Sequence, residues 1–174
     1  MSQIPYKYIG LGNGEEISQN TLNEMARIIR ESSANPNIIS IARKIVAQLP
    51  WKDEYAEVKA VFQFMQEYCR YVKDPVGTET ITTPPLALAQ IRDVRLFHGD
   101  CDDFTVLSLS LLRSIGYPVA MRIASYYPHK IPGHVYGLVR MSDGWKPFDA
   151  IKEGGSFPWE NPSATFVQDY RIDN

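Results

Sequence analysis

One apolar segment, residues 101–115, constrains the fold of this chain more than any other. It is predicted to be a helix with almost no polar face, because Phe, Val, Leu and Ile side chains recur throughout it. Asp100 is a favourable N-cap, Gly116 suits the position just past the helix end, and Pro118 prevents continuation. We therefore expect a buried central helix, with Gly99 permitting a close approach of the chain that precedes it.

Cys101 is the first residue of this predicted helix. The positive end of a helix dipole favours a thiolate over a thiol, which makes the sulfur a candidate nucleophile. The structural alternative is a small buried hydrophobe, the more common fate of a cysteine. Cys69 falls on the apolar stripe of a helix expected to begin near Asp53, and we interpret it as core. Two cysteines form no disulfide framework.

Length and charge limit the domain organisation and the kinds of partner to be expected. We expect 174 residues to form one domain, with a helical extension over 1–50, a core over 51–151 and a tail over 152–174. A net charge of −2 gives no reason to expect a nucleic-acid partner. No apolar run reaches the roughly 20 residues that span a bilayer, and no signal peptide is visible. A cytoplasmic protein with no membrane partner is therefore expected.

Helices are predicted before strands along the chain. The first helix is expected to begin at a capping box formed by Thr21 and Glu24. The second is expected to begin after Asn35, an N-cap followed by a proline, and the third near Asp53. Beyond Gly116 the apolar period changes from 3.6 to 2, which is typical of strands. Strands are expected at 4–9, 117–125, 134–141, 145–151 and 165–172, and a short helix at 86–89. The fold class is therefore α+β, with an antiparallel sheet packed against the central helix.

Cysteine catalysis requires a base near the sulfur and a group that orients the base. His134 begins a predicted strand directly after a Pro-Gly pair, where its side chain can reach a helix terminus. Asp149 on the next predicted strand is the candidate orienting acid. His98 and His129 are expected in loops at the rim of the site, without a chemical step of their own.

The predicted turn raises a geometric difficulty for this pair. If Asp143 and Gly144 formed a two-residue turn, Leu138 would lie opposite Asp149. His134 would then be four residues, about 13 Å, out of register with Asp149. The triad would therefore need a wider loop or a bulge between the two strands.

These residues resemble a known family, the transglutaminase-like superfamily, in its small bacterial and phage members. The resemblance rests on Gly-Asp-Cys-Asp-Asp at 99–103, the Leu-rich helix ending in Gly-Tyr-Pro at 116–118, His-Val-Tyr at 134–136, Trp145 and Asp149, with further similarity at 71–75 and 80–84. It covers about residues 55–150. It implies a papain-like fold and acyl transfer by Cys101, His134 and Asp149, with no cofactor.

The resemblance also implies a preference among reactions. Animal transglutaminases place a bulky aromatic residue directly after the nucleophile, whereas Asp102 and Asp103 follow it here. This favours hydrolysis of an amide or isopeptide bond in a peptide or other amide-containing substrate over protein crosslinking. Phage-type relatives imply a virion or prophage association.

Three other hypotheses remain open at the level of sequence. A transamidase would differ from a hydrolase only in its acceptor. A non-catalytic binding or phage assembly module could retain the fold, because fold does not fix function. A metal site could use His98, Cys101 and the neighbouring aspartates, although no second Cys/His pair completes a zinc pattern. For Asp102 and Asp103 we favour capping and dipole complementation.

Overall fold

The structure, a computed structural model, describes residues 6–8, 19–75, 80–126 and 132–172. Its helices are α1 (Gln19–Ser33), α2 (Pro36–Val46), α3 (Glu54–Tyr68), α4 (Pro84–Val94) and α5 (Cys101–Ser114). Its strands are β1 (Tyr6–Tyr8), β2 (Cys69–Tyr71), β3 (Thr80–Thr82), β4 (Phe97–Gly99), β5 (Val119–Ser125), β6 (His134–Met141), β7 (Gly144–Phe148) and β8 (Phe166–Arg171).

Helix α5 is the centre of the molecule, as predicted. Its N-cap Asp100 accepts a hydrogen bond from the Asp102 N–H, and Asp103 completes a capping box. At the other end, Gly116 has φ +102°, and the N–H groups of Gly116 and Tyr117 bond to the carbonyls of Arg113 and Leu112. This double hydrogen bond is the Schellman arrangement that favours glycine.

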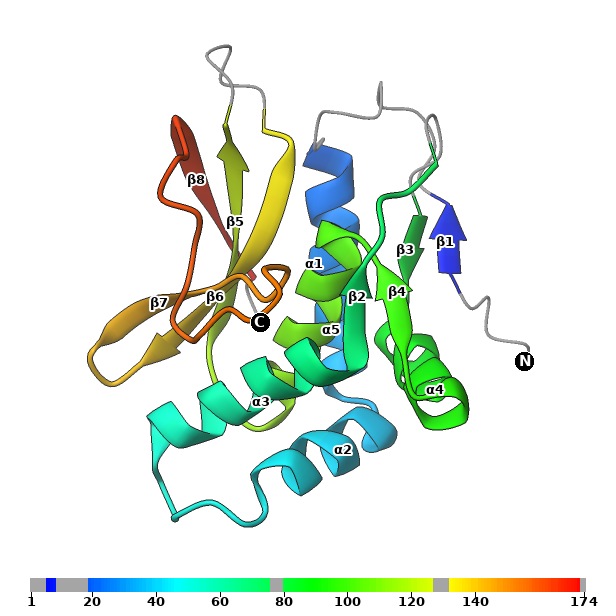
Figure 1. The fold of residues 1–174 in the computed structure, drawn as a ribbon, viewed down its shortest axis with the longest axis vertical. Coiled ribbons are helices and arrows are strands. Elements are labelled where there is room, and N and C mark those ends of the chain that lie inside the picture. The colour runs from blue at the N-terminus through cyan, green and yellow to red at the C-terminus, as the bar shows by residue number, and fades with distance from the viewer. Residues whose placement is uncertain (1–5, 9–18, 76–79, 127–131, 173–174) are drawn as a thin grey trace.

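A four-stranded antiparallel sheet, in the order β7-β6-β5-β8, packs on α5. In Figure 1 the sheet lies on one side of α5, and the other helices surround the rest of it. The approach is close, because a Cβ added to Gly137 of β6 would lie 2.7 Å from Leu109 Cδ2 of α5. The predicted fold class, α+β with a buried helix on an antiparallel sheet, is therefore confirmed.

Two small pairs of strands connect the helices to this core. β1 pairs antiparallel with β3, and β2 pairs parallel with β4, which leads directly into α5. The prediction that His98 lies in a loop is wrong, because its backbone belongs to β4, with the side chain exposed. The prediction that the third helix carries Cys69 is also wrong, since α3 ends at Tyr68 and Cys69 begins β2. Cys69 is nevertheless core, and burial raises the pKa of its thiol to about 12.

The helix starts are mostly as predicted. Asn35 caps α2 with Pro36 in its first turn, and Asp53 caps α3 by accepting from the Ala56 N–H. The first helix differs, because α1 begins at Gln19 and Thr21 is a buried residue of its first turn rather than its cap. The short helix expected at 86–89 extends further, as α4 from Pro84.

The turn between β6 and β7 lies one residue earlier than predicted. Met141 faces Gly144 across the ladder, so Ser142 and Asp143 form the turn. The Ser142 N–H donates to a carboxylate oxygen of Glu54 at 2.8 Å, which anchors this turn to the start of α3. The displacement changes the register of the whole hairpin.

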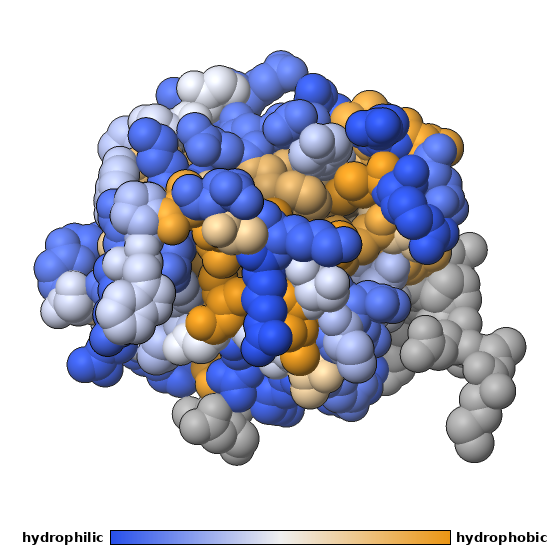
Figure 2. Space-filling model, turned by 90° about the horizontal axis from the view of Figure 1, so that it is seen from below, coloured by the Kyte–Doolittle hydropathy of each residue, from blue (hydrophilic) through white to orange (hydrophobic). Residues whose placement is uncertain are grey.

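In the described part of the chain, no helix is both long and apolar enough to cross a bilayer. Figure 2 shows the molecule from below, where α2 and α3 lie, with hydrophobic residues visible between hydrophilic ones.

Candidate active site

Cys101 lies where the first turn of α5 meets the start of β6. The Thr105 hydroxyl lies 2.7 Å from the Cys101 carbonyl oxygen and 3.2 Å from the Val135 carbonyl oxygen, and it donates to both. The backbone of Val135 also hydrogen-bonds the Cys101 thiol. The nucleophile predicted from sequence is therefore held against the residue that directly follows His134.

His134 and Asp149 form a buried pair. The Nε2 atom of His134 lies 2.8 Å from the Asp149 Oδ2 atom, and the two residues are only 7% and 1% exposed. The second carboxylate oxygen of Asp149 accepts a hydrogen bond from the Ile151 N–H at 3.4 Å. The Asp149 N–H donates to the Trp159 carbonyl oxygen at 3.1 Å, which fixes the backbone of the acid.

The observed register explains how these side chains meet without a bulge. Gly137 faces Phe148, so continuing the ladder by one residue would place Asp149 opposite Tyr136. His134 is then the diagonal neighbour of Asp149 on the same side of the hairpin. Diagonal neighbours lie about 7–8 Å apart, within reach of two such side chains. The expectation of a wider loop or bulge is therefore wrong, because the shifted turn supplies the register.

The bond to Asp149 determines which ring nitrogen of His134 can act on a substrate. A carboxylate accepts hydrogen bonds, so Nε2 carries the proton in the tautomer that this contact favours. Nδ1 is then the nitrogen with a free lone pair. It is the atom of His134 that can take up a proton from a thiol.

A second set of side chains supports the His134 ring. The Tyr136 ring stacks on it, with ring centroids 5.5 Å apart and an angle of 28°. The Tyr136 hydroxyl donates to Glu160 at 2.6 Å, and Arg122 donates to the same oxygen at 3.0 Å. Arg122 also binds Asp169 of β8 through two hydrogen bonds. No sequence motif marks this network, because its acids, Glu160 and Asp169, lie in the tail.

Two tyrosines lie near the thiol and the acid. Burial, together with the negative charge of Asp149, raises the pKa of Tyr71 and of Tyr126 to about 12. Tyr126 packs against the His134 ring at a centroid distance of 6.0 Å, and Tyr71 is 45% exposed. Both hydroxyls therefore stay protonated at neutral pH and can donate hydrogen bonds beside the site.

The protonation state of Cys101 differs from the sequence-based expectation. Burial raises the pKa of its thiol well above the ordinary value, and the charges of Asp102 and Asp100 raise it further. The hydrogen bond with the Val135 backbone lowers it but does not compensate. These effects favour the neutral thiol, against the thiolate expected from the position of Cys101 at the helix N-terminus.

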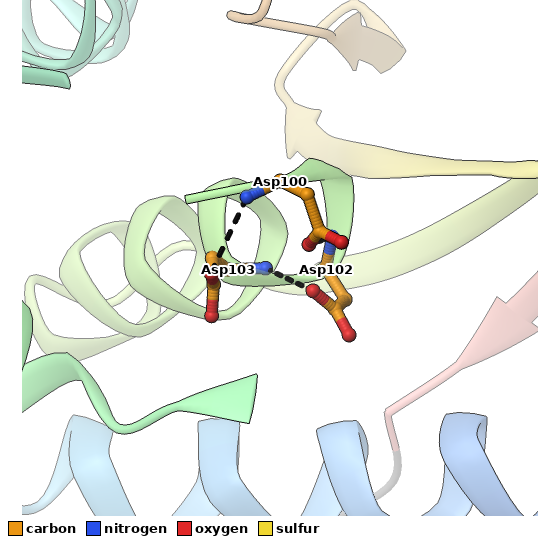
Figure 3. Close-up of side chains that lie close together, drawn as sticks. All are labelled: Asp100, Asp102 and Asp103. Atoms are coloured by element: carbon orange, nitrogen blue, oxygen red, sulfur yellow. Dashed lines mark hydrogen bonds between the residues drawn. The ribbon is translucent and has the colours of Figure 1, made fainter. Parts of the chain in front are cut away.

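Three carboxyl groups cluster at the start of α5 (Figure 3), and the cluster is satisfied from within the chain. Asp103 accepts from the Thr82 N–H at 2.6 Å and from the Asp100 N–H at 3.3 Å. The Asp103 N–H donates to Asp102 at 2.7 Å. These bonds agree with the capping role favoured from sequence. His98 and Cys101 are not part of this cluster, so the metal ligand set considered above does not form among the described residues.

Asp102 makes the stability of the fold depend on pH. Burial raises the pKa of its carboxyl well above the ordinary value, and a hydrogen bond with Asp100 favours the protonated form. The folded chain therefore holds an extra proton above about pH 4, and stability decreases as pH rises through this window. We expect Asp102→Asn, which keeps a donor towards Asp100, to be more stable than the parent at pH 8 by on the order of 1–2 kcal/mol.

This gain should largely disappear at pH 3, where the parent carboxyl is mostly protonated in both folded and unfolded chains. Denaturant unfolding at the two pH values measures it. Asp93→Asn is the control, because Asp93 is exposed and its pKa is lowered by Arg92. Equal stability of Asp102→Asn and parent at pH 8 would contradict the assignment.

Comparison with known proteins agrees with this architecture. The family model of the transglutaminase-like superfamily matches residues 40–150. A candidate cysteine protease from Cytophaga hutchinsonii has a similar fold, with a TM-score of 0.55 and 16% sequence identity. The alignment covers 97% of this chain and 64% of that one, so this chain spans less than two thirds of its length. No curated protein matches. On the match over residues 40–150, the chain belongs to the transglutaminase-like superfamily.

Proposed function

We propose that this protein is a cysteine-dependent acyl-transfer enzyme that hydrolyses an amide or isopeptide bond. The observation that carries the proposal is the buried His134–Asp149 pair, joined at 2.8 Å, beside a cysteine at a helix N-terminus. Membership of the transglutaminase-like superfamily supports the same chemistry. The substrate class is a peptide or another molecule that contains an amide.

Each group has a defined task in the proposed reaction. Nδ1 of His134 accepts the thiol proton as Cys101 Sγ forms a bond to the carbonyl carbon. The C–N bond then breaks, and the imidazolium returns that proton to the leaving amine. Water attacks the resulting thioester with His134 again as base, which releases the acid and regenerates the thiol. Asp149 stabilises the imidazolium formed in each step.

The negative charge that develops on the carbonyl oxygen needs donors. The Cys101 N–H lies in the first turn of α5, where no preceding helical carbonyl can accept from it. A donor of this kind contributes about 3 kcal/mol of transition-state stabilisation. The raised thiol pKa supports general-base activation of a neutral thiol over a preformed thiolate.

An activated ester tests the proposal without knowledge of the natural substrate. With p-nitrophenyl acetate, we expect Cys101 to gain one acetyl group, detected by intact mass and located by peptide mapping. Cys101→Ala should not be acetylated, and Cys69→Ala, which removes the buried core thiol, should be. Release of the acetyl group to water supports a hydrolase. Release only to an added amine supports the transamidase alternative. No acetylation of Cys101 would instead favour a binding module.

The local acidic charge gives a second prediction about the thiol. Asp100 raises the pKa of Cys101, while its side chain caps α5. Asparagine is an equally good N-cap without the charge. We therefore expect Asp100→Asn to be alkylated by iodoacetamide at Cys101 about 3–10 times faster than the parent at pH 8.

Peptide mapping separates Cys101 from Cys69 in this measurement. Asp143→Asn, a change of the same charge in the exposed β6–β7 turn, should leave the rate unchanged. An unchanged or slower rate in Asp100→Asn would show that this carboxylate does not control the thiol.

A further inference from the structure

A cavity lies at the opposite end of α5 from Cys101. It has a volume of about 700 Å³, and its lining includes Arg113, Arg140, Trp145 and Arg171. Helix α5 has 14 residues, so its two ends are about 20 Å apart. This cavity is therefore distinct from the proposed active site.

The sheet register brings the polar groups of the cavity together. Arg140 and Trp145 face each other across the β6–β7 ladder. Arg171, the last residue of β8, places its guanidinium carbon 4.2 Å from the centre of the Trp145 ring. Arg140 and Arg171, on different strands, thus both line the cavity next to Trp145.

Among the residues that the structure describes, no carboxylate balances the positive charge of Arg140 and Arg171 in this cavity. Of the described residues that line it, none is Asp or Glu. Within the described ranges, neither Arg140 nor Arg171 forms an ion pair with a carboxylate. Arg122 of the same sheet contrasts with them, since it binds both Glu160 and Asp169. The chain as a whole has a net charge of −2, so this cationic site is not a consequence of a basic composition.

We propose that this cavity binds an anionic ligand through a phosphate or carboxylate group held by Arg140 and Arg171. A guanidinium group presents two parallel N–H donors that match such oxygens, and paired forks add selectivity for anions. The volume lies within the range of about 300–1,000 Å³ that is typical of small-molecule sites. The Trp145 ring supplies an apolar wall for the rest of the ligand. Arg113 has another interaction within the protein, and it serves here only as part of the wall.

Binding can be measured on the full chain with inorganic phosphate and with citrate as separate probes. Titrations at constant ionic strength, adjusted with chloride, are followed by calorimetry and by tryptophan fluorescence. We expect saturable binding of at least one probe, with one site per chain and a Kd of about 1 mM or tighter. The fluorescence change should disappear in Trp145→Phe. Saturation with phosphate alone identifies a phosphate ligand, and saturation with citrate alone identifies a carboxylate.

Charge variants separate a specific site from general attraction. Arg140→Gln and Arg171→Gln should each weaken binding at least tenfold, whereas Arg43→Gln on α2 should not change it. Arg171→Gln also removes a contact with Trp145 that contributes to stability. The affinity of Arg140→Gln, a change at an exposed residue, is therefore the deciding measurement. Equal affinity in Arg140→Gln and Arg43→Gln would overturn the proposal, as would a response to both probes no larger than that to chloride. The readout does not involve Cys101, so failure of the proposed acyl chemistry would leave the result interpretable.

Discussion

Replacing Asp149 by alanine is expected to slow acetylation of Cys101 by p-nitrophenyl acetate roughly 10³–10⁴-fold, the loss typical of a missing orienting acid. Asp149 is 1% exposed, and its Oδ2 atom holds Nε2 of His134 at 2.8 Å. Without this contact the imidazole can rotate, adopt the other tautomer and lose the charge that stabilises its protonated form. The expected defect lies in the rate of acylation, because the carboxylate acts through His134.

Asp149→Asn separates the loss of charge from the loss of volume. Its side-chain amide can still meet Nε2, but it favours the tautomer with the proton on Nδ1, which removes the lone pair that the thiol needs. We expect a similar loss of rate with a smaller loss of stability. Asp143→Ala, in the exposed turn of the same hairpin, is the matched control. An acylation rate within threefold of the parent in Asp149→Asn would exclude this role.

Local sequence patterns determined the central helix and its ends. Asp100 and Gly116 bound α5 as predicted, because capping and left-handed conformations depend on residues that are neighbours in sequence. The change from helical to strand period also predicted β6 at its observed bounds. The choice of Cys101, His134 and Asp149 depended on a resemblance between spaced motifs, and the structure brings His134 and Asp149 into contact.

Long-range contacts account for what the sequence did not reveal. The β6–β7 turn is anchored by the bond between the Ser142 N–H and Glu54, which are 88 residues apart, so local patterns do not reveal it. The raised pKa of the Cys101 thiol follows mainly from burial, which depends on tertiary packing and not on the position of the residue at a helix N-terminus. The support of Tyr136 by Glu160 links β6 to the tail, where no short motif marks the acid.

Gly99→Ala is expected to lower the free energy of unfolding by about 3 kcal/mol, near the upper end for an overpacked site. An added Cβ would lie 2.5 Å from Asp103 Oδ2, 2.7 Å from Asp103 Cβ and 2.8 Å from the Phe97 ring. Phe97 and Asp103 are 1% and 3% exposed, so neither side chain has space to move. The methyl group would therefore displace β4 from the first turn of α5.

This displacement should also change the alkylation rate of the Cys101 thiol, because Asp103 accepts hydrogen bonds from the Asp100 N–H and from Thr82 of β3 and so holds the start of α5 in place. Denaturant unfolding of Gly99→Ala, read beside the rate of Cys101 alkylation, measures both effects. His98→Ala is the control, because it changes the adjacent, exposed residue of β4. Its free energy of unfolding should differ from that of the parent by about 0.5 kcal/mol or less. If Gly99→Ala and His98→Ala unfold at the same denaturant concentration, the contact between β4 and α5 is not as tight as described. If Gly99→Ala is destabilised but its Cys101 reacts at the parent rate, the first turn of α5 holds the thiol independently of β4.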